Sequence, residues 1–182
     1  MFRMNPHVFE MLHDLLVQSY GLKSTSRMSS REALGIFLWM VGPPESVRQV
    51  EDKFTGSMET ISRKFSHVLD CVCNLAKDII RPKDPSYSSV HPKLANKFSP
   101  LFNSVIGAHR WNTGQVIVRG EKQGPYFNRK SDKTQNVLAI CDFDRRFTFV
   151  AAGIPGSAHD CAVLREAMER YGEHFPHPPA GT

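Results

Sequence analysis

The sequence has no long apolar run, no CxxC cysteine pair and no strong excess of charge of one sign. Its longest uninterrupted apolar run is Ile36–Val41, six residues, whereas a helix that spans a bilayer needs about 20. The first ten residues also lack the apolar core of a secretory signal peptide. We therefore predict no membrane-spanning segment and no secretory leader.

Cysteine is scarce and poorly spaced for metal binding. The four cysteines are Cys71, Cys73, Cys141 and Cys161, and no two stand in a CxxC spacing, so we predict no structural zinc site. Cys71 and Cys73 fall in an apolar helical pattern, which favours buried, reduced thiols. This usage indicates a reducing compartment, the nucleus or the cytosol.

The charge balance permits a nucleic-acid partner without demanding one. Lysine and arginine number 23 against 18 aspartate and glutamate, a net charge of +5. The hydrophobic fraction of 41% is enough for a packed core, and 182 residues allow one ordinary domain or two small ones.

Apolar periodicity divides the chain into a helical and a β-rich half. Helical spacing predicts a helix that ends at Tyr20–Gly21, a second over 31–41 capped by Ser29 or Ser30, a third over 45–54, and a fourth over about 58–79. Four prolines between 81 and 100 indicate a linker or an extended crossing segment. We therefore expect a helical domain over 1–80, a Pro-rich linker over 81–104 and a second domain over 105–182.

The second half has a strand-like pattern. Short strands are predicted at 105–108 and 115–118, and longer ones at 136–141 and 147–152, the latter two joined by a hairpin connection at 142–146. A helix is expected over 158–171.

The turn around Gly56 between the third and fourth predicted helices is typical of a helix-turn-helix. The first turns of the second helix in that motif face the major groove. The predicted DNA contacts are Ser57, Thr60, Arg63 and Lys64. The alternative is a solvated face on a structural helix.

Clustered carboxylates are required for metal-dependent phosphodiester chemistry. Asp160 is the leading candidate because it follows Gly156–His159, a tight turn between an apolar strand and a helix. The alternative is an exposed aspartate favoured by the helix dipole. Asp142 and Asp144 are most simply turn residues. His109 and His159 are further candidate metal contacts.

Several motifs resemble the PIF/Harbinger transposase family. They are Tyr126–Lys130, Thr134–Asp144, Arg146–Val150 and Gly153–Leu164. The resemblance is dense over 105–182, and the helical half is similar to the region that precedes the nuclease in plant members.

This resemblance implies an α+β chain with a helix-turn-helix-like domain before a partial ribonuclease-H-like DDE nuclease domain. In the family, three acidic residues bind Mg²⁺ or Mn²⁺ for DNA cleavage, and Asp160 matches the second of them. The resemblance further implies DNA as partner, contacts from Arg129 and Lys130, a Myb-like partner protein and a nuclear location, with the cytoplasm left open.

Two departures predict an inactive chain. Arg110 stands where the family has its first acid, and a guanidinium repels a divalent cation. The third acid is missing, because the sequence stops at Thr182 before the expected position. Residues 109–114 read as a scrambled segment. We therefore expect a nuclease-like protein without turnover, with a non-catalytic DNA-binding or partner-binding module as the alternative.

Overall fold

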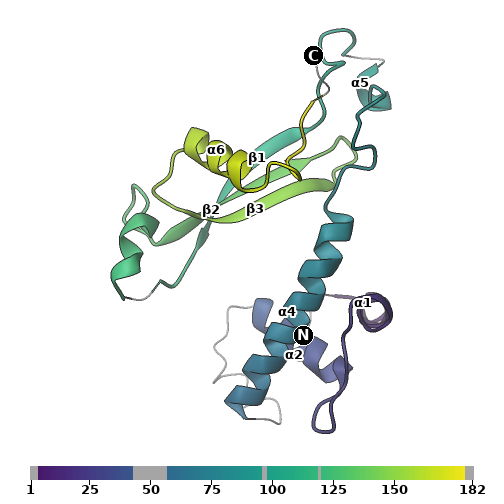
Figure 1. Cartoon of the computed structure of the whole chain (residues 1–182), viewed down its shortest axis with the longest axis vertical. Helices are drawn as coiled ribbons and strands as arrows, with labels where there is room; N and C mark the ends of the chain where they lie inside the picture. Colours follow the sequence, from purple (N-terminus) through teal and green to yellow (C-terminus); the bar gives the residue numbers. More distant parts are fainter. Residues whose placement is uncertain (1–3, 43–56, 96–97, 119, 179–182) are drawn as a thin grey trace. The chain divides into compact units, whose positions relative to one another are not determined.

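The computed structural model describes residues 4–42, 57–95, 98–118 and 120–178. The chain forms two compact units, Met1–Asp78 and Ile79–Thr182, which are described separately. The first is helical and the second contains a three-stranded antiparallel sheet, so the fold class is α+β (Figure 1). None of the described helices is both long and apolar enough to cross a membrane.

The first unit has three described helices, two of which begin at residues suited to capping. Helix α1 (Pro6–Ser19) starts with proline at its first position after the N-cap Asn5, and α2 (Ser30–Val41) follows the N-cap Ser29, whose hydroxyl accepts from the Glu32 amide. Helix α4 (Met58–Ile79) carries a long apolar stripe. The three predicted helices in these ranges are confirmed. The predicted 45–54 helix and the Gly56 turn lie outside the described residues.

One apolar core holds α1, α2 and α4 together. Leu16, Leu34, Ile61 and Val68 are fully buried in it. A buried polar contact joins α1 to α2, since His13 Nε2 lies 2.8 Å from Ser30 Oγ. Cys71 is buried as predicted, but Cys73 is exposed, so the prediction for Cys73 was wrong. These two residues are two apart on a helix and therefore cannot share one face.

The Pro-rich segment is part of the second unit rather than a detached linker. Residues from Ile79 onward cluster with the sheet. The short helix α5 (Pro92–Ala95) lies in this segment, and Lys93 Nζ donates to the carbonyl of Phe143 at 2.8 Å. The expected extended crossing segment is therefore anchored to the hairpin by a side chain.

The sheet has the order β1–β2–β3, with β1 (Ala108–Gln115), β2 (Thr134–Cys141) and β3 (Phe147–Pro155) all antiparallel to their neighbours. Eight consecutive residues of β1 pair with β2. Residues 109–114, which read as a scrambled segment in the sequence, form the body of β1. Val105–Gly107 and Val116–Val118, predicted as strands, flank it instead.

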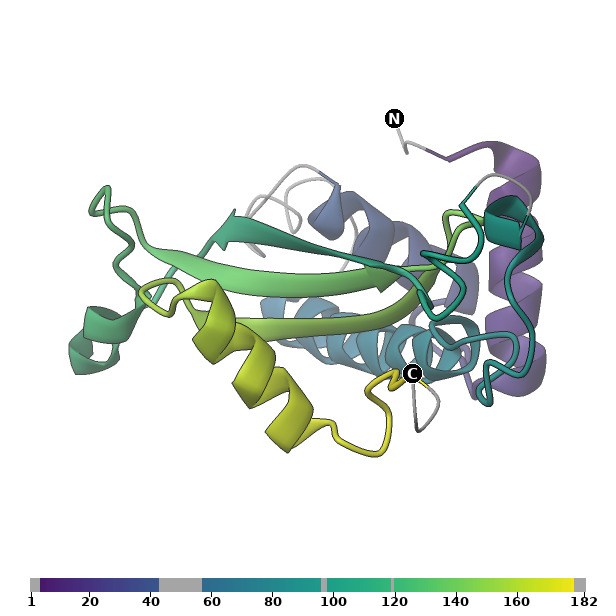
Figure 2. The same ribbon diagram turned by 90° about the horizontal axis from the view of Figure 1, so that it is seen from above.

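Helix α6 (Asp160–Arg170) covers one face of the sheet (Figures 1 and 2). Val163 and Ala167 of α6 pack against Leu138 and Ile154 in a second apolar core. Alternate residues of β2 are buried from Thr134 to Ile140, the period-2 pattern of a strand covered on one face. The predicted hairpin at 142–146 and the helix are confirmed; the helix begins two residues later and ends one residue earlier than predicted.

Two glycines are required where backbones approach closely. A Cβ on Gly107 would lie 2.6 Å from the carbonyl oxygen of Cys141, and one on Gly156 would lie 2.5 Å from that of Thr134. Both contacts are far inside van der Waals distance, so no larger residue fits without backbone movement.

Candidate nuclease site at the start of α6

The turn that leads into Asp160 is hydrogen-bonded to β2. The Gly156 amide donates to the Thr134 carbonyl at 2.9 Å. Asn136 Nδ2 donates to the Pro155 carbonyl at 2.9 Å and to the Ala158 carbonyl at 3.2 Å. Asn136 is buried, so these bonds satisfy a side chain that would be costly to leave unpaired. The position of the Asp160 backbone is therefore fixed by the start of β2.

A second contact reaches the same turn from the loop before β2. Arg129 Nη2 lies 3.0 Å from Nδ1 of His159, the N-cap residue of α6. A guanidinium only donates, so Arg129 is the donor of this contact and Nδ1 of His159 the acceptor. The Ser157 amide also donates to the Pro125 carbonyl at 3.2 Å. The loop 116–133 is thereby attached to the residues on either side of the turn.

Among the described residues, Asp160 belongs to no group of three possible metal ligands. Its side chain is exposed at the first position of α6. Among the described residues, the only three-membered group of possible metal ligands is Glu10, His13 and Asp14 in the first unit. Of the two histidines considered as ligands, His159 accepts from a guanidinium, and His109 makes an edge-to-face contact with Trp111, with ring centroids 5.3 Å apart.

The first strand supplies no acid either. β1 reads AHRWNTGQ, with no aspartate or glutamate at any position. Arg110 pairs with Ala139, so its side chain lies on the sheet face opposite to Leu138 and α6. A pair of divalent ions needs two or three carboxylates held close together. The described residues around Asp160 therefore do not fit the family's metal centre.

The predicted DNA contacts at the start of α4 differ in their surroundings. Arg63 is exposed, whereas Lys64 is 6% exposed and its Nζ donates to the Lys23 carbonyl at 3.4 Å. The hydroxyls of Ser57 and Thr60 lie 3.1 Å apart. Arg63 is therefore exposed to solvent, whereas the ammonium group of Lys64 is hydrogen-bonded within the first unit.

Sequence reasoning missed Asn136 and the contact between Arg129 and His159. Asn136 could have been found, because it is a polar residue at an inward position of an otherwise apolar strand. The Arg129–His159 contact joins residues 30 apart and has no local signal.

Comparison with known protein families gives two matches. Residues 115–175 match the family model described as DDE superfamily endonuclease, and residues 1–74 match a domain of unknown function (DUF8040). The endonuclease match includes β2, β3, α6 and Asp160 but only the last residue of β1, so Arg110 lies outside it. No curated protein and no solved structure matches the chain.

The endonuclease match supports a transposase-derived nuclease domain in the second half of the chain. DDE superfamily endonucleases generally use divalent metals. The domain therefore has the family's sequence pattern, while its described residues hold only one carboxylate at the expected site.

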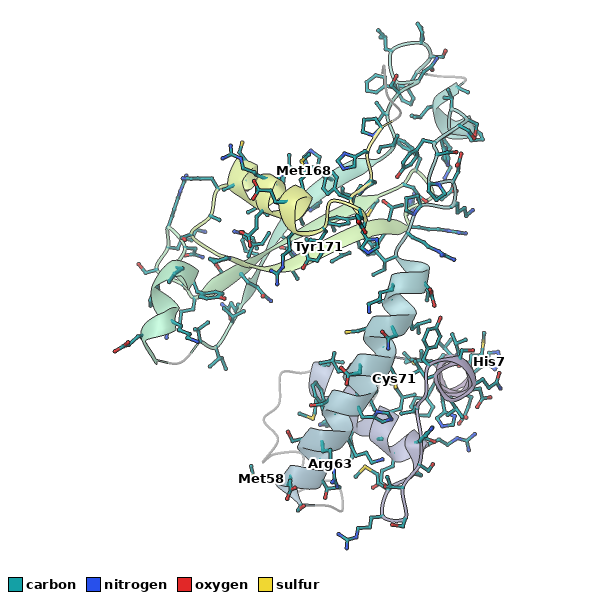
Figure 3. The ribbon with its side chains drawn as sticks, viewed as in Figure 1. His7, Met58, Arg63, Cys71, Met168 and Tyr171 are labelled. Carbon is teal, nitrogen blue, oxygen red and sulfur yellow. The ribbon has the colours of Figure 1, made fainter. Side chains whose placement is uncertain are left out.

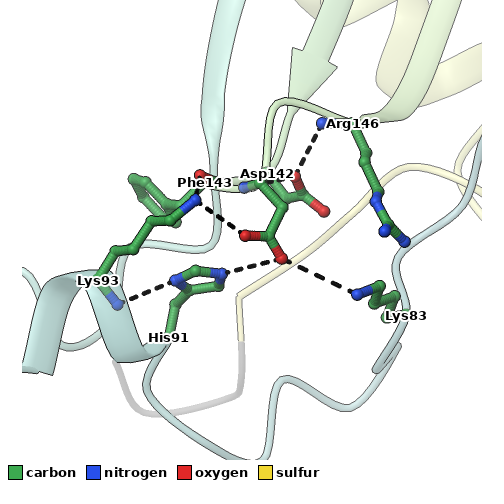
Figure 4. Close-up of polar contacts among 7 residues, drawn as sticks. Lys83, His91, Lys93, Asp142, Phe143 and Arg146 are labelled. Atoms are coloured by element: carbon green, nitrogen blue, oxygen red, sulfur yellow. Dashed lines mark hydrogen bonds and ion pairs between the residues drawn. The ribbon is translucent and has the colours of Figure 1, made fainter.

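A cluster of charged side chains lies where the β2–β3 hairpin meets the 81–95 segment (Figure 4). Asp144 accepts from Lys93 Nζ at 2.9 Å, and its other oxygen lies 3.5 Å from His91 Nε2 and 3.9 Å from Lys83 Nζ. The hydrogen bond from Lys93, followed by that from His91, lowers the pKa of Asp144. The cluster borders a pocket of about 250 Å³.

Asp144→Asn is expected to speed hydrogen–deuterium exchange in residues 91–95, because the variant loses the charge that holds Lys93 and His91. A lowered folded pKa means that the stabilisation is present above the ordinary aspartate pKa of about 3.9 and is lost as the pH falls through the folded value. Wild-type protection should therefore decline below about pH 4. Asp132→Asn is the control, since Asp132 forms no ion pair with any described residue; equal exchange in both variants would contradict the assignment.

Proposed function

We propose that the chain is a Harbinger-type transposase-derived protein that binds DNA and does not cleave it. The observation that carries the absence of cleavage is that Asp160 belongs to no group of three possible metal ligands among the described residues. In-line attack on a phosphodiester needs clustered acids that hold the metal ions on both the attacking and the leaving oxygen. The Harbinger assignment is supported by the motifs from Tyr126 to Leu164.

The DNA-binding part of the proposal is supported by the first turns of α4. Arg63 is exposed near the N-terminal end of this helix (Figure 3). An arginine there can contact a phosphate or a base edge if the helix serves as the recognition helix of a helix-turn-helix. A nuclear location and a Myb-like partner belong to the same proposal, by resemblance to the family.

Arg63→Ala is expected to weaken binding to duplex DNA and to reduce the slope of log K against log salt by about one unit, because one phosphate contact is lost. Fluorescence anisotropy with a labelled duplex, repeated at several salt concentrations, measures both quantities.

Lys64→Ala should leave this slope unchanged, since its ammonium group is engaged with Lys23. Lys77→Ala, an exposed lysine near the other end of α4, is the matched control. If Arg63→Ala behaves like Lys77→Ala, the recognition-helix assignment is wrong.

A further inference from the structure

The pocket beside the β2–β3 hairpin is lined by residues of the second unit and has one apolar wall. Its volume is about 250 Å³, slightly below the range of about 300–1,000 Å³ that is typical of sites for drug-sized ligands. The pocket therefore suits one long side chain or one small molecule. Its apolar wall is formed by Tyr87, Val90, Val105, Ile106 and Phe143.

The charged groups that line the pocket are mainly acidic. Three carboxylates and one ammonium group give a net charge of −2 when the imidazole of His91 is neutral; they belong to Asp84, Asp142, Asp144 and Lys83 (Figure 4). Asp144 is paired, since Lys93 Nζ lies 2.9 Å from one of its oxygens and Lys83 Nζ lies 3.9 Å from the other. The negative charge that remains in the pocket is therefore that of Asp84 and Asp142.

Asp84 keeps its charge at every physiological pH. Its two oxygens accept from the amides and the hydroxyls of Ser86 and Ser88. The hydrogen bond from the Ser86 hydroxyl, followed by that from the Ser88 hydroxyl, lowers the pKa of Asp84 to about 2. These donors are neutral, so they orient the carboxylate without cancelling its charge.

Asp142 is the second carboxylate without a counter-ion. Its Oδ1 accepts from the amides of Asp144 and Arg146, both at 2.9 Å, and these donors are again neutral. Like Asp84, it forms no ion pair with any described residue. Arg145 and Arg146 belong to the same hairpin, but neither lines the pocket. A cation that enters the pocket therefore meets two carboxylates that are in no ion pair.

Tyr87 places an aromatic ring beside these two anions. Its side chain is half-buried, and burial, followed by the charges of Asp84 and Asp142, raises the pKa of its hydroxyl. The backbone of Tyr87 is in the left-handed region, with a φ of 47°, which bulky residues rarely adopt. Its amide donates to the Asp84 carbonyl at 3.2 Å. The turn at 84–88 thus holds the ring and the Asp84 carboxylate in one part of the pocket.

The lining excludes two common classes of ligand. A phosphate is repelled by the net negative charge. A divalent cation needs several carboxylates around one point, and the only group of three possible metal ligands in the described part of the chain lies in the first unit. A guanidinium group suits both the charge and the aromatic wall, because it is planar and weakly hydrated, donates to carboxylates through several N–H groups and stacks on aromatic rings.

We propose that the pocket binds an alkylguanidinium group, either the side chain of an arginine from a partner protein or a small free guanidinium compound. The carboxylates of Asp84 and Asp142 accept from its N–H groups, and the rings of Tyr87 and Phe143 contact its plane and its alkyl stem. This activity goes beyond DNA binding and does not rest on it, since the acidic lining repels the phosphate backbone.

The test is a titration of the isotopically labelled full-length protein, followed by amide chemical shifts. The ligands are agmatine, a capped Gly-Arg-Gly peptide, and the same peptide with lysine or with neutral citrulline in place of arginine. We expect saturable shifts at residues 82–91 and 142–144 from a guanidinium compound and none from the citrulline peptide. Binding of the arginine peptide without agmatine would assign the ligand to a partner protein, and the reverse would assign it to a small molecule.

Asp142→Asn should weaken the binding of the guanidinium compound about tenfold or more, because it removes a charged acceptor. An asparagine oxygen can still accept from the amides of Asp144 and Arg146, so the turn is retained. Asp132→Asn, which removes one charge from a residue outside the pocket, is the matched control and should weaken binding less than about twofold.

Equal weakening in the two variants would overturn the proposal. The same holds for equal shifts from the arginine and citrulline peptides, or for no saturable shift from either guanidinium compound. Equal or tighter binding of the lysine peptide would overturn the guanidinium assignment in favour of a general site for organic cations. Circular dichroism melting checks folding, and the comparison of arginine with citrulline on the wild type decides the question if Asp142→Asn unfolds.

Discussion

Asn136→Asp is expected to lower the free energy of unfolding of the second unit by about 2–4 kcal/mol at pH 7. The substitution replaces a buried amide, which donates to the carbonyls of Pro155 and Ala158, by a carboxylate that faces the same two oxygens. The charge would be buried against two acceptors without a counter-ion. Urea unfolding of the second unit, followed by hydrogen exchange of residues 134–141, measures the loss.

The pH dependence of this variant provides a second check. An aspartate in this position has a folded pKa raised above the unfolded value of about 3.9. The penalty is therefore largest at neutral pH and becomes smaller as the pH falls and the carboxyl group is protonated. Asn112→Asp, on exposed β1, is the control. A penalty that matches the control, or one that does not change between pH 7 and pH 4, would show that Asn136 does not hold the turn.

Leu16→Ala is expected to destabilise the first unit by about 2–5 kcal/mol, because it leaves a cavity in a close-packed core. Leu16 is fully buried between the helices, whereas the preceding Leu15 is 40% exposed. Leu15→Ala removes the same atoms from the same helix and should cost less than about 1 kcal/mol. Denaturant unfolding monitored by helical circular dichroism compares the two, and similar losses would mean that α1 does not pack as described.

The helices could be predicted because their signals are local. Ser29 caps α2 with a bond to an amide three residues later, and the apolar stripe of α4 repeats at helical spacing over its whole length. The hairpin was also predictable, since Asp142 accepts from the amides of Asp144 and Arg146 within the turn itself.

β1 could not be placed correctly from its own sequence. It contains Arg110, Asn112 and Gly114 among its residues, and its intrinsic preference for a strand is weak. Its pairing with β2 decides the strand, and pairing is a long-range property that composition does not reveal. The apolar runs at 105–108 and 115–118 have a stronger local strand pattern than the residues between them. The two short strands were therefore predicted on either side of the true strand.

The candidate site was predictable in part. The motif around Asp160 located the residue at the start of a helix, as the structure has it. The hydrogen bonds from Asn136 to the turn before Asp160 could not be predicted, and neither could the burial of Lys64. Both depend on partners more than 15 residues away in the sequence. The absence of acids from β1 was visible in the sequence, because no aspartate or glutamate occurs between Asp84 and Glu121.

The central claim is that the chain binds DNA without cutting it, and a cleavage assay tests this most directly. Wild type and Asp160→Ala are incubated with supercoiled plasmid in Mg²⁺ and in Mn²⁺, at salt concentrations where anisotropy shows the DNA to be bound. We expect no nicked or linear product above the buffer control from either protein, since Asp160 belongs to no group of three possible metal ligands among the described residues and the metal pair needs clustered carboxylates. Metal-dependent cleavage by the wild type that Asp160→Ala abolishes would contradict the claim.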